Sequence, residues 1–168
     1  SGDRVLVIGT VFRGGALLDG VLSTKVDIDG TDATEKIAEM VNKSKFKPQL
    51  QCIFLDGIAV GGFNIIDIRE LSRKTKLPVI VIIRRKPDLE KIKKTLVRID
   101  KKDRIILLEK AGNVVNVDKI YVQLAGISVE KAKEILKIVC TRSLIPEPIR
   151  IAHLIASGVV DGESRGKA

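Results

Sequence analysis

The sequence predicts an α/β protein with a mixed sheet, in which an antiparallel hairpin comes first and parallel strands alternating with helices follow. Residues 51–55 and 79–83 are almost continuously apolar, which is typical of strands covered by helices on both faces. Residues 21–28 instead alternate between apolar and polar side chains, as in a strand with one exposed face. These three segments define the order of the predicted sheet.

The first third of the chain is expected to form the hairpin and one helix. Strands at 4–8 and 21–28 flank a glycine pair at 14–15, which indicates an antiparallel pair. Asp32 then stands where a helix N-cap is expected, with Glu35 three residues later as in a capping box.

Two strand–helix units follow. The strand at 51–55 leads through a glycine-rich segment to a helix for which Asn64 is the expected N-cap. The strand at 79–83 leads to a helix that Asp88 is expected to cap. Strand, helix, strand and helix at this spacing predict a βαβ unit with a parallel strand pair.

The last third is predicted to begin with short strands and to end with helices. Residues 104–108 and 119–123 are predicted as extended stretches, so that residues 103–124 would be a β insertion. Ser128 is the expected N-cap of a further helix, and a last helix should run over residues 149–156.

An antiparallel hairpin followed by this alternation is the order of a ribonuclease H-like mixed sheet, whereas a flavodoxin-like sheet would be parallel from its first strand. With 168 residues, the chain has the size of a single domain. No apolar run reaches the roughly 18 residues needed to cross a bilayer. Cys52 and Cys140 are interpreted as small buried hydrophobes in a reduced compartment, so we expect a cytoplasmic protein.

The charge balance favours a polyanionic partner such as DNA or RNA, because 30 Lys and Arg stand against 21 Asp and Glu, a net charge of +9. The same abundance of charge also suits a protein from a hot environment, whose surface ion pairs form networks. Four Phe and one Tyr are too few for the aromatic platform on which single-strand readers stack bases.

Asp56 is the first candidate site residue. It follows the first apolar strand, and α/β sheets bind ligands just beyond the carboxyl ends of their strands. Arg84, Arg85 and Lys86 follow the second apolar strand, where they would hold a phosphate beside that carboxylate. The simpler alternatives are that Asp56 starts an Asp-Gly turn and that the basic run is a solvated strand end.

His153 is the single histidine of the chain. Its place among apolar residues of the last predicted helix is explained either by packing in the core or by a role as a ligand. Capping alone is sufficient to explain Asp32 and Glu35. One histidine and two separated cysteines do not supply the ligands of a zinc site.

The glycines Gly57, Gly61 and Gly62, together with Asn64, could form a cradle of backbone N–H groups for a phosphate at a helix N-terminus. A tight turn from strand to helix would need glycine as well. The spacing matches neither of the common nucleotide-binding glycine motifs, so no nucleotide cofactor is predicted.

Several motifs spread over nearly the whole chain resemble those of DUF99, an archaeal family of uncharacterised proteins. The motifs are LDGIA at 55–59, GGFN at 61–64, TRS at 141–143, PEPIRIAH at 146–153 and GESRG at 162–166. That family is similar to endonuclease V, a ribonuclease H-like enzyme that cuts deaminated nucleic acid near inosine with a divalent metal.

The resemblance implies roles for individual residues. Asp56 resembles the strand-end aspartate that binds the metal, His153 resembles the metal-site residue of the final helix, and Glu35 is the nearest match to a helix-borne glutamate. The implied cofactor is Mg²⁺ or Mn²⁺. Arg84, Arg85 and Lys86 lie where endonuclease V places a basic residue after the next parallel strand, and no one of the three is singled out. The residues predicted to contact phosphate are these three together with Arg142 and Arg150.

The front of the chain departs from the family pattern. The family carries a strand of the Gly-Ile-Asp-Asp-Gly type, with its first catalytic aspartate, before the region that opens here at Ser1. We therefore expect a domain that lacks its first strand, either because a segment is missing from the given sequence or because the protein lacks that acid.

Three functions fit these observations. The first is a divalent-metal-dependent endonuclease that acts on DNA or RNA, with Asp56 and His153 at its site. The second is a non-catalytic nucleic-acid-binding module on the same fold. The third is a structural or regulatory homodimer formed through residues 103–124.

Overall fold

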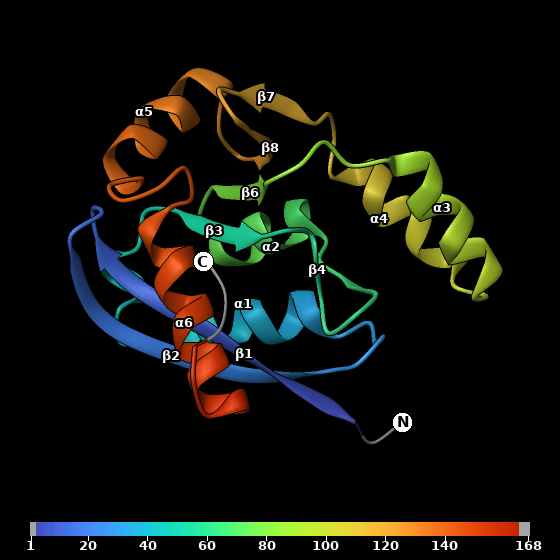
Figure 1. Ribbon diagram of the computed structural model, residues 1–168, viewed down its shortest axis with the longest axis horizontal. Helices are drawn as coiled ribbons and strands as arrows, with labels where there is room; N and C mark the ends of the chain where they lie inside the picture. The colour runs from blue at the N-terminus through green and yellow to red at the C-terminus, as the bar shows by residue number, and fades with distance from the viewer. Residues whose placement is uncertain (1–2, 165–168) are drawn as a thin grey trace.

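A four-stranded mixed sheet forms the centre of the structure, a computed structural model that describes residues 3–164 (Figure 1). Its strands lie in the order β3 (Ile53–Asp56), β6 (Val79–Ile83), β8 (Ile120–Ala125) and β7 (Val115–Val117). β3 and β6 run parallel, which confirms the predicted parallel pair. β8 runs antiparallel to both of its neighbours.

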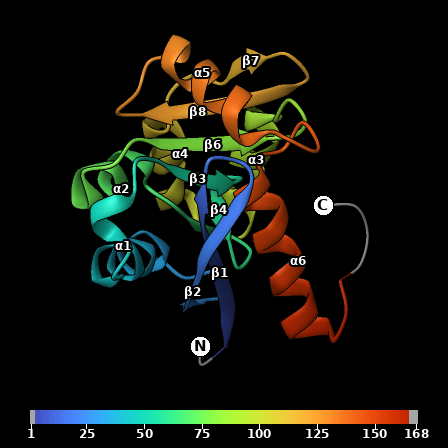
Figure 2. The same ribbon diagram turned by 90° about the vertical axis from the view of Figure 1, so that its left-hand side faces the viewer.

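Helices cover both faces of this sheet (Figure 2). On one face lie α1 (Ala33–Lys43), the short 3₁₀ turn η1 (Lys47–Gln49) and α2 (Ile68–Thr75). On the other face lie α5 (Val129–Val139) and α6 (Glu147–Asp161). The sheet is therefore the middle layer of three.

β6 joins the two apolar cores, because successive side chains of a strand point to opposite faces. Val79 and Val81 pack in the core that contains α1 and α2, whereas Ile80 and Ile82 pack in the core that contains α5 and α6. All four side chains are buried. Burying one such side chain stabilises a protein by roughly 1.5–3 kcal/mol. The side chains of β6 therefore contribute to the stability of both cores.

The predicted N-terminal hairpin is confirmed as β1 (Arg4–Arg13) and β2 (Leu17–Asp27), which pair antiparallel. Within residues 3–164 this hairpin is a separate two-stranded sheet, with no ladder between β1 and β3. α6 packs along β1, and the hydroxyl of Thr10 donates a hydrogen bond to the carbonyl oxygen of Pro148 (2.6 Å). Helix packing therefore holds the hairpin against the rest of the fold.

The glycine-rich segment after β3 is a small hairpin of β4 (Ala59–Val60) and β5 (Asn64–Ile65). The prediction that Asn64 caps the next helix is wrong, because α2 begins only at Ile68. The cap is Asp67, whose side chain accepts a hydrogen bond from the backbone N–H of Glu70 (3.1 Å).

Asn64 instead joins three segments from a fully buried position. Its amide nitrogen donates to the carbonyl oxygen of Asp27 (2.9 Å) and to Oδ1 of Asp32 (2.7 Å), and its amide oxygen accepts from the backbone N–H of Ala33 (3.0 Å). Asp32 is the N-cap residue of α1, as predicted, but its own side chain makes no cap bond. The Asn64 amide satisfies the first helical N–H in its place.

Asp32 is stabilised as a carboxylate by this network. Burial raises the pKa of Asp32, but the hydrogen bonds from Asn64 and from the backbone N–H of Asp27 outweigh that effect and hold the pKa below its ordinary value. The negative charge therefore persists at neutral pH beside the start of α1.

The chain after β6 forms a helical arm that projects from the sheet (Figure 1). It consists of α3 (Leu89–Arg98), η2 (Lys102–Arg104) and α4 (Ile105–Lys110). Asp88 caps α3 as predicted, by accepting a hydrogen bond from the backbone N–H of Lys91 (3.1 Å).

The prediction of an extended stretch at 104–108 is wrong. A short apolar run fits a strand or a helical turn equally well, and here Leu108 packs with Leu96 and Ile65 in a small helical core. The other stretch, 119–123, is confirmed as the region of β8. Because β8 pairs with β6 and with β7, it is an inner strand of the four-stranded sheet, whereas β7 is an edge strand.

The last two helices lie where the sequence predicts them, and α6 is longer than predicted. Ser128 caps α5 as predicted, through the backbone N–H of Lys131 (3.2 Å). α6 is longer than the predicted 149–156, because prolines are tolerated in a first turn whose N–H groups have no helical partner. No helix within residues 3–164 has the length and apolarity needed to cross a membrane. The polar tail beyond α6 continues past 164, and residues 165–168 lie outside the described part.

Replacing Asn64 with Ala should lower the free energy of unfolding by about 3 kcal/mol, because buried groups of three segments lose their partners together. Urea denaturation measures this change. The matched control is Asn42→Ala, since Asn42 is exposed on α1 and donates one hydrogen bond to the carbonyl of Lys74 (3.0 Å). The control should change stability by no more than about 0.5 kcal/mol. Equal losses in the two variants would contradict the role given to Asn64.

Candidate functional site

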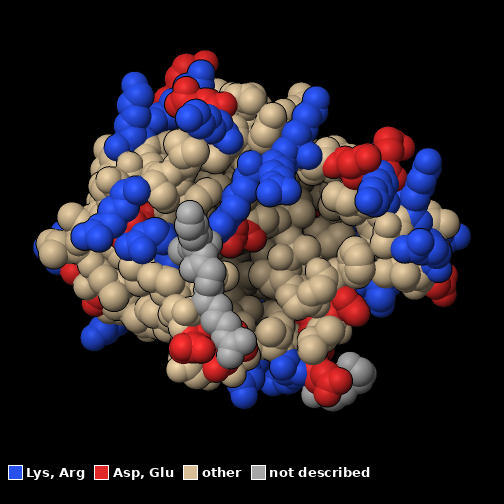
Figure 3. Space-filling view, in the orientation of Figure 1, with Lys and Arg blue, Asp and Glu red and all other residues tan. Residues whose placement is uncertain are grey.

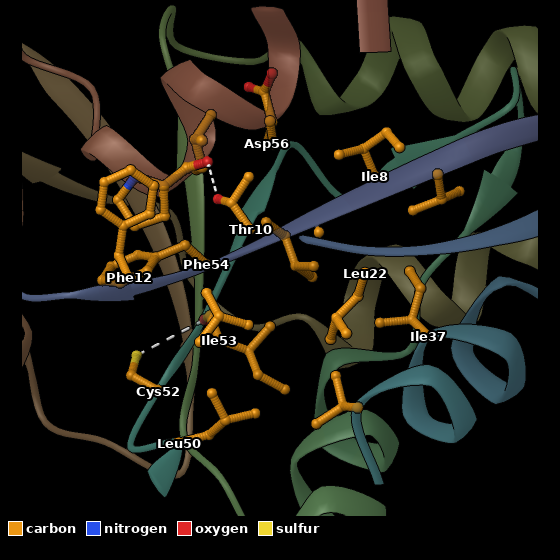
Figure 4. A pocket seen from close by; sticks show the side chains of 18 of the residues that line it. Ile8, Thr10, Phe12, Leu22, Ile37, Leu50, Cys52, Ile53, Phe54 and Asp56 are labelled. Atoms are coloured by element: carbon orange, nitrogen blue, oxygen red, sulfur yellow. Dashed lines mark hydrogen bonds between the residues drawn. The ribbon is translucent and has the colours of Figure 1, made fainter. Parts of the chain in front are cut away.

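A cavity of about 810 Å³ separates β1 from β3, and we call it the β1–β3 groove. The facing edges of the two strands form its sides, α6 covers one face and α1 covers the other. Most of the side chains that line it are apolar, and Asp56 lies at one end (Figure 4). The groove is therefore apolar along most of its length and polar at the end near Asp56.

Asp56 is the last residue of β3, and its side chain is 46% exposed. Its Oδ2 lies 3.5 Å from Nη2 of Arg84, which follows the parallel neighbour β6. Figure 4 shows the carboxylate directed away from the apolar lining. Among the described residues Arg84 is the side-chain partner of this carboxylate, and Gly57, with a φ of +80°, begins the bend that follows β3.

His153 lies on α6 and lines the same groove as Asp56. The residue is exposed, so the alternative of a histidine packed in the core is wrong. The structure therefore brings the two residues expected at a metal site, Asp56 and His153, to one groove from different elements.

Three basic residues border the site. Arg84, Arg85 and Lys86 are exposed and follow the end of β6. Figure 3 shows a hollow on this face of the molecule, with Lys and Arg side chains gathered above it over the segment between β6 and α3. A phosphate at this hollow would meet positive charge on one side.

The remaining two basic candidates differ from each other. Arg142 is exposed, whereas Arg150 is held by Glu147, with Nε of Arg150 donating to Oε2 of Glu147 (2.8 Å) and a second bond from Nη2. These hydrogen bonds, opposed by burial, keep the pKa of Glu147 below its ordinary value, and the charge of Arg142 adds to the effect. The guanidinium of Arg150 is therefore engaged in the first turn of α6.

Glu35 does not join this site. It is exposed in the first turn of α1 and is not among the residues that line the β1–β3 groove. Within residues 3–164 there is no group of three or more His, Cys, Asp or Glu side chains that could hold a metal ion. Mg²⁺ usually keeps several waters and binds one or two protein carboxylates, so Asp56 supplies one ligand of the kind that this ion takes.

The glycine segment does not form the expected phosphate cradle. Gly57, Gly61 and Gly62 have positive φ, as predicted for turns, but the segment leads into β5 rather than into a helix N-terminus. The carboxylate of Asp29 packs into this turn, since its Oδ1 accepts the backbone N–H of Phe63 (2.8 Å) and leaves no room for a Cβ at Gly62. Asn64 is engaged in the buried network described above.

Neither cysteine is poised for catalysis. Burial raises the pKa of the Cys52 thiol to about 12 and that of the Cys140 thiol to about 11. Both thiols are thus protonated at neutral pH, and a thiol is a weak nucleophile.

Two contacts that shape the site were not predicted from the sequence. Glu147 and Arg150 are three residues apart on a helix, and that spacing is a readable signal for an ion pair. The hydrogen bond from Thr10 to Pro148 joins residues 138 positions apart, so no local sequence pattern predicts it.

Comparison with known proteins assigns the chain to a group of archaeal relatives. The family model described as Endonuclease dU matches residues 1–160. A UPF0215 protein of Methanothermobacter thermautotrophicus is 54% identical over 173 residues, which cover 100% of this chain and 85% of that protein. A UPF0215 protein of Archaeoglobus fulgidus is 45% identical over 166 residues, which cover 98% of this chain and 91% of that protein.

Solved structures confirm the predicted fold. A protein of unknown function from Archaeoglobus fulgidus matches with a TM-score of 0.85 and 39% identity, over 94% of this chain and 98% of that one. Endonuclease V of Ciona intestinalis, solved with a 24mer DNA that contains an inosine followed by a ribo-adenosine, matches with a TM-score of 0.53 and 19% identity. That match covers 95% of this chain and 86% of the other, and it shows a shared fold.

Replacing Glu147 with Gln should lower the free energy of unfolding by about 2 kcal/mol at neutral pH, because a charge-assisted double hydrogen bond at a buried position is lost. The folded-state pKa of Glu147 is lowered, so the pair stabilises the protein fully above the ordinary pKa of 4.5, and this contribution is lost as pH falls through the lowered value. Denaturation at neutral and acidic pH should therefore show a difference between variant and wild type that shrinks in acid.

The control for this change is Glu70→Gln. Glu70 pairs with Arg73 at the same spacing and with the same two-bond geometry, but on an exposed face of α2. Its replacement should cost clearly less than that of Glu147. A Glu147→Gln protein as stable as wild type at neutral pH would contradict the role given to this pair.

Proposed function

The chain belongs to the endonuclease dU family, and from this premise we propose that it is an endonuclease that acts on nucleic acid at the exposed tips of β3 and β6. The observation that carries the proposal is the juxtaposition of Asp56 and Arg84 at those tips, beside the groove that His153 lines. The family name points to DNA that contains deoxyuridine as the first substrate to test. The shared fold with an endonuclease V solved with DNA supports the same class of function.

The ion pair between Asp56 and Arg84 is weak enough for a ligand to replace either partner. The two side chains are 46% and 40% exposed and their charged atoms lie 3.5 Å apart. Pairs of this kind contribute roughly 0–1 kcal/mol to stability. A phosphate can therefore bind Arg84, and a cation can bind Asp56, with little loss in the stability of the folded protein.

The positive charge of the protein supports binding to a phosphate backbone. The chain carries a net charge of +9, and Arg84, Arg85 and Lys86 place three exposed cations at the border of the hollow. Contacts of this kind position a nucleic acid without reading its sequence. Base preference would have to come from other side chains near the groove.

A divalent cation, Mg²⁺ or Mn²⁺, is part of the proposal, with Asp56 and His153 as the donors that this chain offers. Such a cation stabilises charge that develops on a phosphodiester during hydrolysis. The described residues supply no third donor at this place, so we assign no step to the metal. The same observation favours the second candidate function, a nucleic-acid-binding module without catalysis.

The catalytic proposal is tested by cleavage of end-labelled DNA and RNA that carry one deoxyuridine or one inosine, with Mg²⁺, Mn²⁺ or a chelator. The wild-type protein should cut, and Asp56→Asn should lower the rate by roughly 100-fold or more, the usual loss when one group at a reacting centre is removed. Asp118→Asn is the matched control, since Asp118 is exposed in the turn between β7 and β8 and has a positive φ that Asn adopts readily.

Two outcomes count against catalysis at Asp56. Cleavage that persists in Asp56→Asn would remove Asp56 from the chemistry. Intact strands in every reaction, with binding preserved, would select the non-catalytic module.

Binding is tested separately by the combined replacement of Arg84, Arg85 and Lys86 with Ala. The affinity for a DNA duplex should fall, and the slope of log K against log salt should decrease by about 2 to 3, because each lost phosphate contact removes about one unit. Fluorescence anisotropy at several salt concentrations measures both quantities. The control replaces three exposed lysines of α5 and removes the same charge: Lys131, Lys133 and Lys137. An equal change of slope in the control would contradict a specific phosphate contact at the end of β6.

A further inference from the structure

Most of the net positive charge of the protein is concentrated in residues 84–110, which include the basic run after β6 and the helical arm. This segment contains 11 Lys and Arg against 5 Asp and Glu, so it carries +6 of the net charge of +9. Networks of surface ion pairs, as in proteins from hot environments, need both signs in similar number. The excess in this segment therefore points to a partner of opposite charge.

Three of these cations lie on one face of α3. Lys91, Lys94 and Arg98 follow one another at spacings of three and four residues, which places them on the same side of a helix. All three residues are exposed. Ile92 and Leu96 lie on the opposite side of α3 and pack in the small core of the arm. We call the three cations the α3 basic face.

Within residues 3–164, no side chain of the α3 basic face has an ion-pair or hydrogen-bond partner. Two carboxylates of the arm are engaged elsewhere, since Nζ of Lys93 lies 3.8 Å from Oε1 of both Glu90 and Glu109. Like charges three or four residues apart on a helix repel each other. A bound polyanion would relieve this repulsion.

Three contacts fix the orientation of the arm on the body of the protein. The buried Arg104 donates a hydrogen bond from Nη1 to the carbonyl oxygen of Phe63 (2.8 Å), and Nζ of Lys110 lies 3.6 Å from Oδ2 of Asp67. Ile65 of β5 packs in the core of the arm. Figure 3 shows Lys and Arg side chains over the arm on the same face of the molecule as the hollow. The basic run and the arm can therefore contact one ligand together.

We infer that the α3 basic face binds the phosphate backbone of the same DNA duplex that lies at the tips of β3 and β6. The inference rests on the proposed binding of nucleic acid at those tips. Contacts with phosphates fix the position and the register of a duplex without reading its bases. The arm thus holds the duplex on one side of the strand tips and helps to set which phosphate lies beside Asp56.

The length of the arm sets how far this contact extends along the duplex. The chain from Arg84 to Lys91 spans at most about 25 Å, at roughly 3.5 Å per residue, and α3 rises about 10 Å from Lys91 to Arg98. Phosphates of one strand follow each other about every 3.4 Å along the axis of the duplex. The whole α3 basic face therefore lies within about ten base pairs of the strand tips.

The test replaces Lys91, Lys94 and Arg98 together with Ala, which favours helix at exposed positions. Fluorescence anisotropy in the presence of a chelator measures binding to a duplex with roughly 12 base pairs on each side of one deoxyuridine. The affinity should fall by roughly 10-fold or more at about 50 mM salt, and the slope of log K against log salt should decrease by about 2 to 3.

Two further variants serve as controls. The triple replacement in α5 described above removes the same charge from a helix that lies apart from the arm (Figure 1), and it should change the affinity much less. The second variant combines Lys91→Arg, Lys94→Arg and Arg98→Lys. It keeps the charge of the α3 basic face and should bind the duplex as the wild type does.

The dependence on duplex length separates a contact from long-range attraction. When the flanks are shortened in steps from about 12 to about 5 base pairs, the wild type and the α5 control should lose affinity as the part that the arm reaches is removed. The α3 variant should lose less, because it no longer contacts that part.

Two results would overturn the inference. The first is an α3 variant whose affinity and salt slope equal those of the α5 control. The second is a loss of affinity in the α3 variant that is the same at every duplex length. Cleavage is not measured in these experiments, so the inference and the nuclease activity can fail separately. An α3 variant that binds as the α5 control does, beside a weakened variant of Arg84, Arg85 and Lys86, would exclude the arm and retain the proposed site.

Discussion

The parallel pairing of β3 with β6 is the constraint on which the rest of the structure depends. The register places Asp56 opposite Ile82, so the two strands end together and Arg84 follows within reach of the carboxylate. β6 can hold that register because its side chains enter both apolar cores, and a shift by one residue would exchange the two faces. The buried side chains of β6 thus fix the positions of Asp56 and Arg84, although these two residues are themselves exposed.

α6 is the second element that gives the site its form. It lies against β1 and close to β3, carries His153 along the groove, and is anchored at its start by Thr10 and by the pair of Glu147 and Arg150. An ion pair at the first turn keeps negative charge where the helix dipole favours it. Side chains of β1, β3, α1 and α6 therefore line the groove, and nucleic acid is proposed to bind at its polar end.

The fold was predictable from the sequence where buried side chains determine the apolar pattern of a strand or helix. The apolar runs identified β3 and β6, and capping residues such as Asp88 and Ser128 marked helix starts, because these signals are local. The short run at 104–108 was misread, since its pattern suits strand and helix equally. Asn64 was misread for a different reason. Its partners lie more than 30 residues away, and only the folded chain shows that its amide closes a buried network. Asp56 was found from its place after a strand, whereas the engagement of Arg150 and the exposure of His153 required the structure.

The most direct test of the central claim is a crystal structure of the full-length Asp56→Asn protein with a DNA duplex that carries one deoxyuridine. The account predicts that a backbone phosphate beside that nucleotide contacts Arg84 or its basic neighbours, with residue 56 and His153 facing the same phosphate. A duplex bound elsewhere, for example on the arm of α3 and α4 with the tips of β3 and β6 left free, would contradict the account.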